Sequence, residues 1–443
     1  MSFSRYPKYK SSGVEWLGDV PEHWDCSRLK EFSRFSGGGT PTRENLAYWS
    51  GSIPWVSPKD MKSEIVLESE ESITELGLNS SATSLVPPGA VLLVVRSGVL
   101  KHTIPVGINQ VSVTLNQDMK AIRPELARCL PFFLLRWIQG LNDQLLDAWS
   151  KQGATVESIE HDYLSKTIVP LPPLPEQRSI AAFLDAETSK IDALVSEQEH
   201  LIALLREKRQ AVISHAVTKG LNPNVKMRPS GVEWLGDVPV HWEVKRLKYL
   251  GEAITGLTYS PDDIVEPGEG TLVLRSSNVQ SGKIALDDCV FVGCEIPAEL
   301  RTRSGDILIC SRNGSRDLIG KNAMIDGSSE GSTFGAFMTV FRSQHARYIE
   351  CVLNSPIFEY QSGQFLTSTI NQLTIGTLND FAVPFPPKVE RDQIAESIRE
   401  VRQTTNALAV EAERAISLLK ERRSALISAA VTGQIDVRGA VPA

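Results

Sequence analysis

The stretch from Glu176 to Val217 reads EQRSIAAFLDAETSKIDALVSEQEHLIALLREKRQAVISHAV and contains neither proline nor glycine. A proline-rich segment that ends at Pro175 precedes it, and Gly220, a residue type that caps helices in the left-handed conformation, follows it. These signals predict one long helix. Its apolar residues recur in steps of three, four or seven, which is typical of a narrow heptad seam that packs on another helix. The seam positions are Ile180, Leu184, Ile191, Leu194, Leu201, Leu205 and Val212.

A second copy of this stretch lies in the same chain. From Glu390 to Val431 the sequence ERDQIAESIREVRQTTNALAVEAERAISLLKERRSALISAAV repeats the pattern 214 residues further along. Both copies follow a proline-rich preface, VPLPP at Val169 and VPFPP at Val383. We therefore expect the two helices to form an intramolecular antiparallel pair. The seam of the second copy contains Ile394, Ile398, Val401, Leu408, Leu419 and Leu426.

A second repeated block opens each half of the chain. SGVEWLGDVPEHW begins at Ser12 and SGVEWLGDVPVHW at Ser230, and twelve of the thirteen positions are identical. The block is either a docking surface for a partner that is present twice, or the place where tryptophans close equivalent hydrophobic corners of two related domains. These tryptophans are Trp16, Trp24, Trp234 and Trp242.

Between each block and its helix the halves diverge into short β-branched runs bounded by Gly, Pro, Asn and Ser, which indicate β-rich domains. Short helices are expected over 130–146 and 348–360. The predicted fold class is therefore α+β and internally duplicated: two β-rich domains joined by two long antiparallel coiled-coil helices in a pseudo-two-fold arrangement. The predicted domains are 1–170, the first β-rich domain; 171–220, the first long helix; 221–387, the second β-rich domain; and 388–443, the second long helix with the C-terminal tail.

Composition sets wider limits. A chain of 443 residues with 42% hydrophobic content is large enough for at least two cores. Its beginning does not read as a signal peptide and its apolar runs are too short to span a bilayer, so we expect a cytoplasmic protein without membrane contact. The six cysteines are scattered, which disfavours a zinc site. The net charge of −7 argues mildly against nucleic-acid binding but does not exclude a local basic patch.

No catalytic motif is convincing. GSRDLIGKN from Gly314 resembles a phosphate loop, but five residues separate Gly314 from Gly320 where the motif needs four, and Asn322 stands where Ser or Thr is required. The histidines fit no catalytic signature, and no adenosylmethionine-binding or amino-methyltransferase motif is present. We therefore expect a non-catalytic protein whose function is recognition.

The loops that follow the expected strands have suitable chemistry for DNA. Arginine bonds guanine O6 and N7 in pairs, and asparagine does the same to adenine. For each residue alone, an ordinary solvated loop position remains the alternative. The candidate DNA-binding residues are Thr40, Arg43, Trp55, Arg96, Lys101 and His102 in the first domain, and Arg275, Ser277, Asn278, Arg312, Asn313, Arg316 and Lys321 in the second.

The whole arrangement resembles the specificity subunit of a type I DNA restriction-modification enzyme. The resemblance lies in IPWVSPKDM at Ile53, the strands GAVLLVVRSG at Gly89 and GDILICSRNG at Gly305, and VPLPPLPEQRSIA at Val169. It implies that 1–170 and 221–387 are target-recognition domains, each of which reads one half of a split double-stranded DNA site. It also implies that 171–220 and 388–443 contain spacer helices and that two methyltransferase subunits bind them. Restriction subunits are a further implied partner, and S-adenosylmethionine and ATP are expected on partner subunits, with no cofactor or metal on this chain.

The spacing of the predicted helices fits such a subunit. About 42 residues at ~1.5 Å per residue give about 63 Å, against roughly 34 Å for one DNA turn. We expect half-site centres separated by roughly 10 base pairs. Two other classes stay open: a long-hairpin adaptor without DNA binding, which would need a signal peptide or anchor, and a fused enzyme, which would need catalytic motifs.

Overall fold

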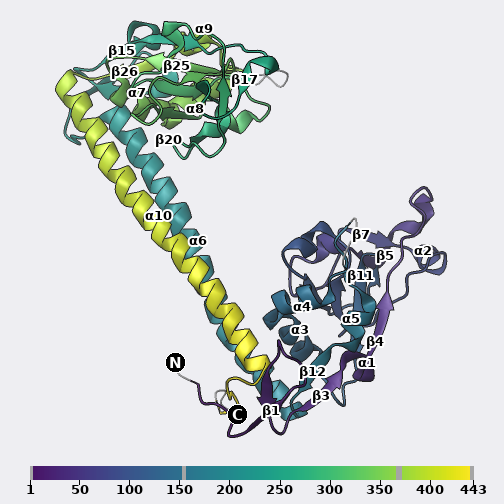
Figure 1. The fold of residues 1–443 in the computed structure, drawn as a ribbon. Helices are drawn as coiled ribbons and strands as arrows, with labels where there is room; N and C mark the ends of the chain where they lie inside the picture. Colours follow the sequence, from purple (N-terminus) through teal and green to yellow (C-terminus); the bar gives the residue numbers. More distant parts are fainter. Residues whose placement is uncertain (1–2, 152–155, 366–371, 440–443) are drawn as a thin grey trace. The chain divides into compact units, whose positions relative to one another are not determined.

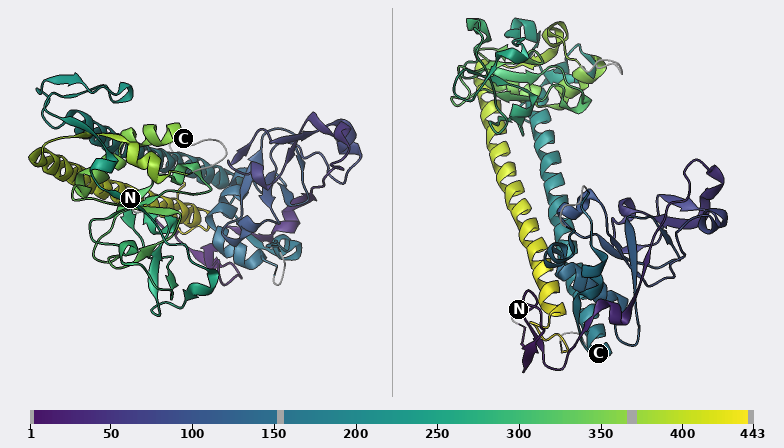
Figure 2. Two further views of the ribbon diagram at one scale, coloured as in Figure 1. Left: turned by 90° about the horizontal axis from the view of Figure 1, so that it is seen from above. Right: turned by 45° about the vertical axis from the view of Figure 1, so that its right-hand side comes forward.

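The computed structural model describes residues 3–151, 156–365 and 372–439. The chain divides into two compact units, Met1–Gln198 with Arg414–Ala443, and Glu199–Glu413. Each unit contains a globular part with most of its strands and one stretch of each long helix (Figures 1 and 2). The division into four domains predicted from the sequence stays a prediction.

The two long helices are α6, Leu174–Lys219, and α10, Lys388–Val431. In the first unit the beginning of α6 shares a hydrophobic core with the end of α10, through Ile180 and Ile427. In the second unit the end of α6 shares a core with the beginning of α10, through Val217 and Ile394. The helices therefore pair in antiparallel fashion within each unit, which confirms the predicted α+β fold with two long helices.

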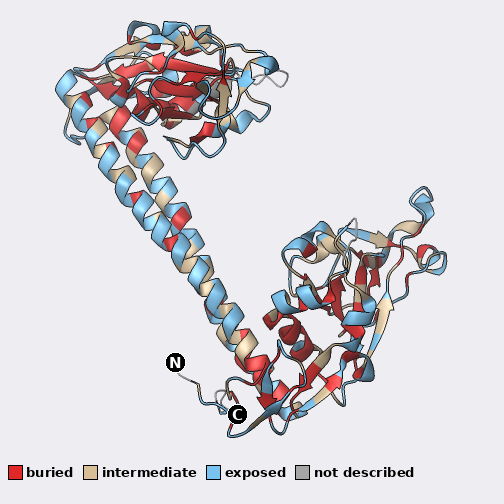
Figure 3. Ribbon diagram, viewed as in Figure 1, coloured by how far each residue is buried: buried red, intermediate tan, exposed pale blue. Residues whose placement is uncertain are grey.

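The seam of the pair differs from the predicted one in its middle. Leu194, Leu201 and Leu408 are 45%, 40% and 48% exposed. Thr188 and Thr405 are buried instead, because each hydroxyl donates to the carbonyl oxygen four residues earlier in its own helix, at 2.7 and 2.8 Å. The prediction placed leucines in the seam and missed two threonines, whose hydroxyl groups form hydrogen bonds within their own helix. Figure 3 shows few buried positions in the middle of either helix.

The repeated block closes the start of each long helix. Trp24 and Trp242 are fully buried, which supports the packing interpretation, whereas Trp16 is 37% exposed and does not close a corner. The side chain of Trp234 lies outside the described residues. The block supplies the turn and the second strand of a hairpin in each unit, β1–β2 (Tyr9–Ser11, Asp19–Pro21) in the first and β13–β14 (Met227–Pro229, Asp237–Pro239) in the second.

The buried carboxylate at the start of α6 collects donors from this block. Glu176 accepts hydrogen bonds from the Tyr6 hydroxyl at 2.6 Å and from the Trp24 indole at 3.0 Å, and it contacts His23 Nε2 at 2.8 Å. In the second unit His241 contacts Glu390 at the same distance, 2.8 Å. The block therefore anchors the N-terminal end of each long helix.

The divergent regions share one topology. The main sheet has the order β4-β11-β8-β9-β6 in the first unit and β16-β25-β22-β23 in the second, and a smaller sheet runs β10-β5-β7 and β24-β18-β21-β17. In both smaller sheets one pair, β10 with β5 and β24 with β18, is parallel. The first set is β4 Ser33–Gly37, β5 Trp49–Val56, β6 Ile65–Val66, β7 Glu71–Ile73, β8 Val91–Val94, β9 Val106–Asn109, β10 Thr114–Leu115 and β11 Met119–Pro124. The second set is β16 Glu252–Thr255, β17 Ile264–Val265, β18 Thr271–Leu274, β21 Val290–Val292, β22 Ile307–Cys310, β23 Asn322–Met324, β24 Thr333–Phe334 and β25 Met338–Arg342.

A further strand pair joins the beginning of each globular part to its end. These antiparallel pairs are β3 (Asp25–Arg28) with β12 (Ile168–Leu171), and β15 (Glu243–Arg246) with β26 (Ala382–Phe385). A small hairpin in the second unit is formed by β19 (Val279–Gln280) and β20 (Lys283–Ile284). The short helices α1 Leu29–Phe32, α2 Glu75–Asn79, α5 His161–Lys166 and α9 Ile375–Asp380 complete the regular structure.

The two longer helical segments predicted in the β domains are each broken in two. α3 (Pro131–Gly140) and α4 (Asn142–Trp149) meet at Leu141, and α7 (Ala346–Leu353) and α8 (Pro356–Phe365) are separated where Pro356 lacks a backbone donor. A Cβ on Gly140 would lie 2.9 Å from the Ser428 nitrogen, so glycine allows α3 to approach α10 closely. Across the described ranges, every helix is too short or too polar to cross a membrane.

Ion pairs link each β domain to its long helices. In the first unit Arg136 of α3 is buried and donates to Asp185 of α6 at 2.7 Å and to Glu64 at 2.8 Å. In the second unit the domain supplies the acid, and Arg402 of α10 donates both bonds to Glu350 of α7 at 2.6 and 2.7 Å. Such pairs are costly to break because one charge is left buried without its partner.

The pKa of Glu64 is sensitive to the ion pairs that link the first β domain to its long helices. Burial acts to raise it, but the attraction of Arg136 and hydrogen bonds from Arg136 and Arg423 outweigh burial and hold the pKa below its ordinary value. A carboxyl group with a lowered folded-state pKa stabilises the fold above the unfolded-state pKa, and this stability is lost as the pH falls through the folded value.

The variant Glu64→Gln should therefore be less stable than the wild type at pH 7, by about 1–3 kcal/mol. The difference should shrink below about pH 4, because the wild-type carboxyl is then protonated as well. Urea unfolding of the full chain at pH 7, 5 and 3.5 measures this. Glu68→Gln, at an exposed neighbouring position, is the control and should match the wild type throughout. A pH-independent loss in Glu64→Gln would contradict the electrostatic explanation.

Candidate nucleic-acid interface

Each β domain presents loops in equivalent positions. In the first unit the backbone nitrogens of Val95 and Arg96, directly after β8, donate to the Asp118 carbonyl oxygen at 2.8 and 3.3 Å. In the second unit those of Ser311 and Arg312, directly after β22, donate to the Phe337 carbonyl oxygen at 3.0 Å each. Arg96 and Arg312 are therefore structural equivalents. The same comparison makes Asp118 equivalent to Phe337.

The ends of the smaller sheets join these loops. The Asn116 nitrogen donates to the Val56 carbonyl at the end of β5 at 2.9 Å, and the Gly335 nitrogen donates to Leu274 at the end of β18 at 3.0 Å. We call residues 57–60, 95–102 and 116–118 the first loop cluster. Residues 275–278, 311–316 and 335–337 form the second loop cluster.

The two equivalent arginines are held differently. Arg96 Nε donates to the Asp118 carboxylate at 2.7 Å. The Arg312 guanidinium lies over the Phe337 ring, 5.1 Å from its centroid. Both arginine side chains are exposed, so one cluster presents an arginine oriented by a carboxylate and the other an arginine beside an aromatic ring.

A third segment borders each cluster and was missed in the sequence. Arg96 forms a backbone bridge with Ser158, and Arg312 forms one with Gln372. Ser158 comes shortly before α5 and Gln372 shortly before α9. The only available signal was the polar sequence at the equivalent place in each half, because these contacts connect residues far apart in the chain.

The glycine-rich stretch before β5 serves close packing. A Cβ on Gly38 would lie 2.0 Å from the Asn116 carbonyl oxygen. Gly256 is the equivalent glycine before β18, and a Cβ there would lie 2.2 Å from the Gly335 carbonyl oxygen. Two chain segments can therefore touch backbone to backbone. The Thr40 hydroxyl donates to Gln117, which adds Gln117 to the residues that the sequence did not indicate.

The loop after β18 joins the second cluster directly. Asn313 Nδ2 donates to the Ser276 hydroxyl at 3.2 Å, so the predicted residue Asn313 contacts the loop that carries the predicted residue Ser277. Arg275 forms an ion pair with Asp288 at 2.8 Å. Asn278 is fully buried, and its amide donates to the carbonyl oxygens of Ala285 and Asp288 at 2.9 Å each. Asn278 therefore holds the loop in shape and does not reach the surface.

The other candidates of the first domain separate into two places. Lys101 and His102 are exposed at the end of the short helix Gly98–Lys101 in the first loop cluster. Arg43 lies instead over Trp49 at 4.1 Å and pairs with Glu71, while Trp55 is 3% exposed and its indole donates to the Gly39 carbonyl at 2.9 Å. Trp55 is thus a core residue of the smaller sheet, and Arg43 covers that core.

The remaining candidates of the second domain lie on the loop after β22. Arg316 is exposed at the start of the short helix Arg316–Leu318, and Lys321 is half-buried just before β23. Lys59, in the short helix Pro58–Asp60 after β5, is exposed in the position equivalent to Ser277 and was not selected from the sequence.

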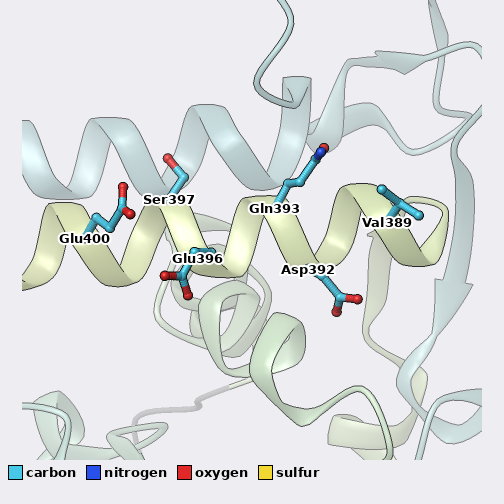
Figure 4. A pocket seen from close by; sticks show the side chains of 6 residues that line it. All are labelled: Val389, Asp392, Gln393, Glu396, Ser397 and Glu400. Atoms are coloured by element: carbon cyan, nitrogen blue, oxygen red, sulfur yellow. The ribbon is translucent and has the colours of Figure 1, made fainter.

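A shallow hollow on α10 is lined by Val389, Asp392, Gln393, Glu396, Ser397 and Glu400 (Figure 4). The carboxylates of Asp392 and Glu396 project from the helix in one direction there. The equivalent face of α6 carries Phe183, which packs edge-on against Phe3 with ring centroids 5.3 Å apart. Throughout residues 3–151, 156–365 and 372–439 no group of three or more His, Cys, Asp and Glu side chains is arranged to hold a metal.

Comparison with known proteins gives consistent matches. Residues 21–201 match the type I restriction modification DNA specificity domain. The specificity subunit of the Escherichia coli type I restriction enzyme EcoR124I/EcoR124II is 32% identical over 231 residues, covering 52% of this chain and 49% of that subunit. The aligned region therefore spans about half the length of this relative. The specificity subunit of the type I restriction enzyme MjaVIII from Methanocaldococcus jannaschii is 23% identical over 95% of this chain and 94% of its own length.

Solved structures agree at the level of the fold. A chain from a structure of the assembly and conformational transition of the type I R-M system matches with a TM-score of 0.72 at 16% identity, covering 93% of this chain and 98% of that one. The HsdS subunit from Thermoanaerobacter tengcongensis matches with a TM-score of 0.51 at 16% identity, covering 94% and 98%. These matches confirm the resemblance predicted from the sequence motifs.

The variant Gly38→Ala should shift the turn at Asn116 and destabilise the first unit by about 1–3 kcal/mol, because the added methyl group would overlap a backbone oxygen. Thermal unfolding of the full chain, with hydrogen exchange over residues 115–118, measures the effect. Gly37→Ala is the control, since a Cβ there meets nothing within 4 Å. Equal behaviour of the two variants would show that the close approach at Gly38 is not required.

Proposed function

We propose that this chain, a relative of the type I restriction-modification DNA specificity subunits, is the sequence-specific DNA-recognition subunit of a type I complex. Each β domain reads one half of a bipartite, asymmetric site in double-stranded DNA. The observation that supports this most directly is the equivalent placement of Arg96 and Arg312 in two loop clusters built on the same topology. Two copies of one fold provide two DNA-reading domains. Because their side chains differ, the two domains recognise different DNA sequences.

The chemistry of the loop clusters suits base edges and phosphates. The exposed members are Lys59, Arg96, Lys101 and His102 in the first cluster and Ser277, Arg312 and Arg316 in the second. Thr40 is also exposed and contacts the first cluster through Gln117. Arginine beside guanine gives the commonest specific contact, and lysine or serine can bond bases or phosphate oxygens. Arg275, Asn313 and Lys321 are less exposed and border these residues, whereas Trp55 and Asn278 are left out of the proposed contacts.

The long helices are proposed to space the readers and to dock two methyltransferase subunits. Their exposed apolar residues support this role, since Leu194, Leu201 and Leu408 lie outside the seam between the helices. The chain itself is proposed to be non-catalytic, with S-adenosylmethionine and ATP bound by methyltransferase and restriction subunits. The two docking surfaces would be unequal, because Phe183 of α6 is packed against Phe3, whereas the equivalent Ser397 of α10 lines a hollow beside Glu396.

The methylated sequence in a host that carries the complete system tests the proposal. We expect a bipartite, asymmetric motif with half-site centres separated by about 10 base pairs. Methylome sequencing measures it, and deletion of the gene for this chain is the control, which should remove the motif. A continuous palindromic motif would contradict two independent readers. Survival of the motif in the deletion strain would show that this chain is not the reader.

An exchange of one domain tests how the reading is divided. Replacing Cys26 to Val169 with the corresponding segment of another relative should change one half of the motif and leave the other half intact, because the second loop cluster is built from residues outside that segment. The reciprocal exchange of the second domain is the matched control and should alter the other half. A change in both halves after a single exchange would rule out separate readers.

A further inference from the structure

Phe337 is an exposed aromatic residue in the middle of the second loop cluster. It lies in the turn between β24 and β25, and 58% of its surface is accessible. Its carbonyl oxygen accepts hydrogen bonds from the backbone nitrogens of Ser311 and Arg312 and from the Ser311 hydroxyl, each at 3.0 Å. Three hydrogen bonds therefore fix the backbone at Phe337, while its exposed ring is not a member of the hydrophobic cores of this unit.

The equivalent residue in the first domain makes a different kind of contact. Asp118 uses its carboxylate to orient Arg96, whereas Phe337 has no hydrogen-bonding group in its side chain and leaves Arg312 over its ring. Beyond its contact with Arg312, an exposed ring in this place gains free energy by covering apolar surface. In the major groove the apolar group at a base edge is the C5-methyl group of thymine, and phenylalanine is among the residues that contact it.

We propose that Phe337 reads a thymine in the second half-site by packing its ring on the C5-methyl group, with Arg312 contacting the neighbouring base or phosphate. This inference rests on the proposed function, because it assigns one specificity-determining residue within the DNA-reading cluster. It also explains why the two halves of the target differ: equivalent backbone positions carry a polar reader in one domain and an apolar reader in the other.

Deoxyuridine provides the direct test, since it differs from thymidine only by the absence of that methyl group. The complete methyltransferase complex is assembled with the wild-type chain, and each thymine of the second half-site is replaced in turn by deoxyuridine. One replacement should weaken binding about three- to tenfold, the size expected for losing the burial of one methyl group. With Phe337→Ala the thymine site should be weakened to a similar extent, and the same deoxyuridine should have no further effect.

Two controls separate recognition from folding. Tyr249→Ala, at an aromatic residue of the same unit that is 73% exposed and lies outside the loop cluster, should bind both DNAs as the wild type does. Thermal unfolding of Phe337→Ala should be unchanged, because the ring is outside the core. A deoxyuridine in the first half-site should change the binding affinity of the wild type and of Phe337→Ala to the same extent.

The inference is overturned if the second half-site contains no thymine on either strand, or if every deoxyuridine replacement there is neutral for the wild type. A deoxyuridine penalty that persists in Phe337→Ala overturns it too, because another residue then contacts the methyl group. These outcomes leave sequence-specific methylation by the wild-type complex intact. A complex that methylates no bipartite site would instead remove the proposed function, and this inference with it.

Discussion

The two long helices pair in antiparallel fashion through a seam whose ends merge with the hydrophobic cores of the two units, and the rest of the fold depends on this pairing. The seam is narrow and partly built from residues such as Thr188 and Thr405, so neither helix would bury enough apolar surface alone. Because the two helices are antiparallel, the end of α10 packs beside the beginning of α6. The first unit is consequently assembled from both ends of the chain, and the second from one continuous stretch.

In the first unit the two ends of the chain meet where the repeated block contacts the turn after α10. In the second unit the repeated block follows α6 directly in the sequence and makes the equivalent contact. The Tyr9 hydroxyl donates to the Gly433 carbonyl at 2.9 Å, and the Asp436 nitrogen donates to the Ser4 carbonyl at 2.8 Å. Gly433 lies next to Trp24 as Gly220 lies next to Trp242, and both glycines have positive φ, 73° and 80°. The left-handed turn after each long helix is therefore a shared requirement for seating the repeated block.

The sequence predicts those parts of the fold that depend on local pattern. The helices, the repeated blocks and the strands that precede Arg96 and Arg312 follow from periodicity and punctuation. The seam register was wrong at Leu194, because side-chain hydrophobicity does not reveal that Thr188 can satisfy its hydroxyl within the helix. The burial of Trp55 and Asn278 and the placement of Ser158 and Gln372 depend on contacts between distant segments. No pattern along the chain contains that information.

The pairing of the arginines bears on how an acidic chain could read DNA. Arg43, Arg96 and Arg275 each form an ion pair with a carboxylate of their own domain, so their charge is largely compensated. Compensated arginines add little to the release of counterions that drives non-specific affinity. A guanidinium held by a carboxylate is instead fixed in direction, which favours discrimination between base edges. In the proposed complex this chain would therefore supply sequence discrimination, and its partner subunits would supply much of the phosphate contact that holds the DNA.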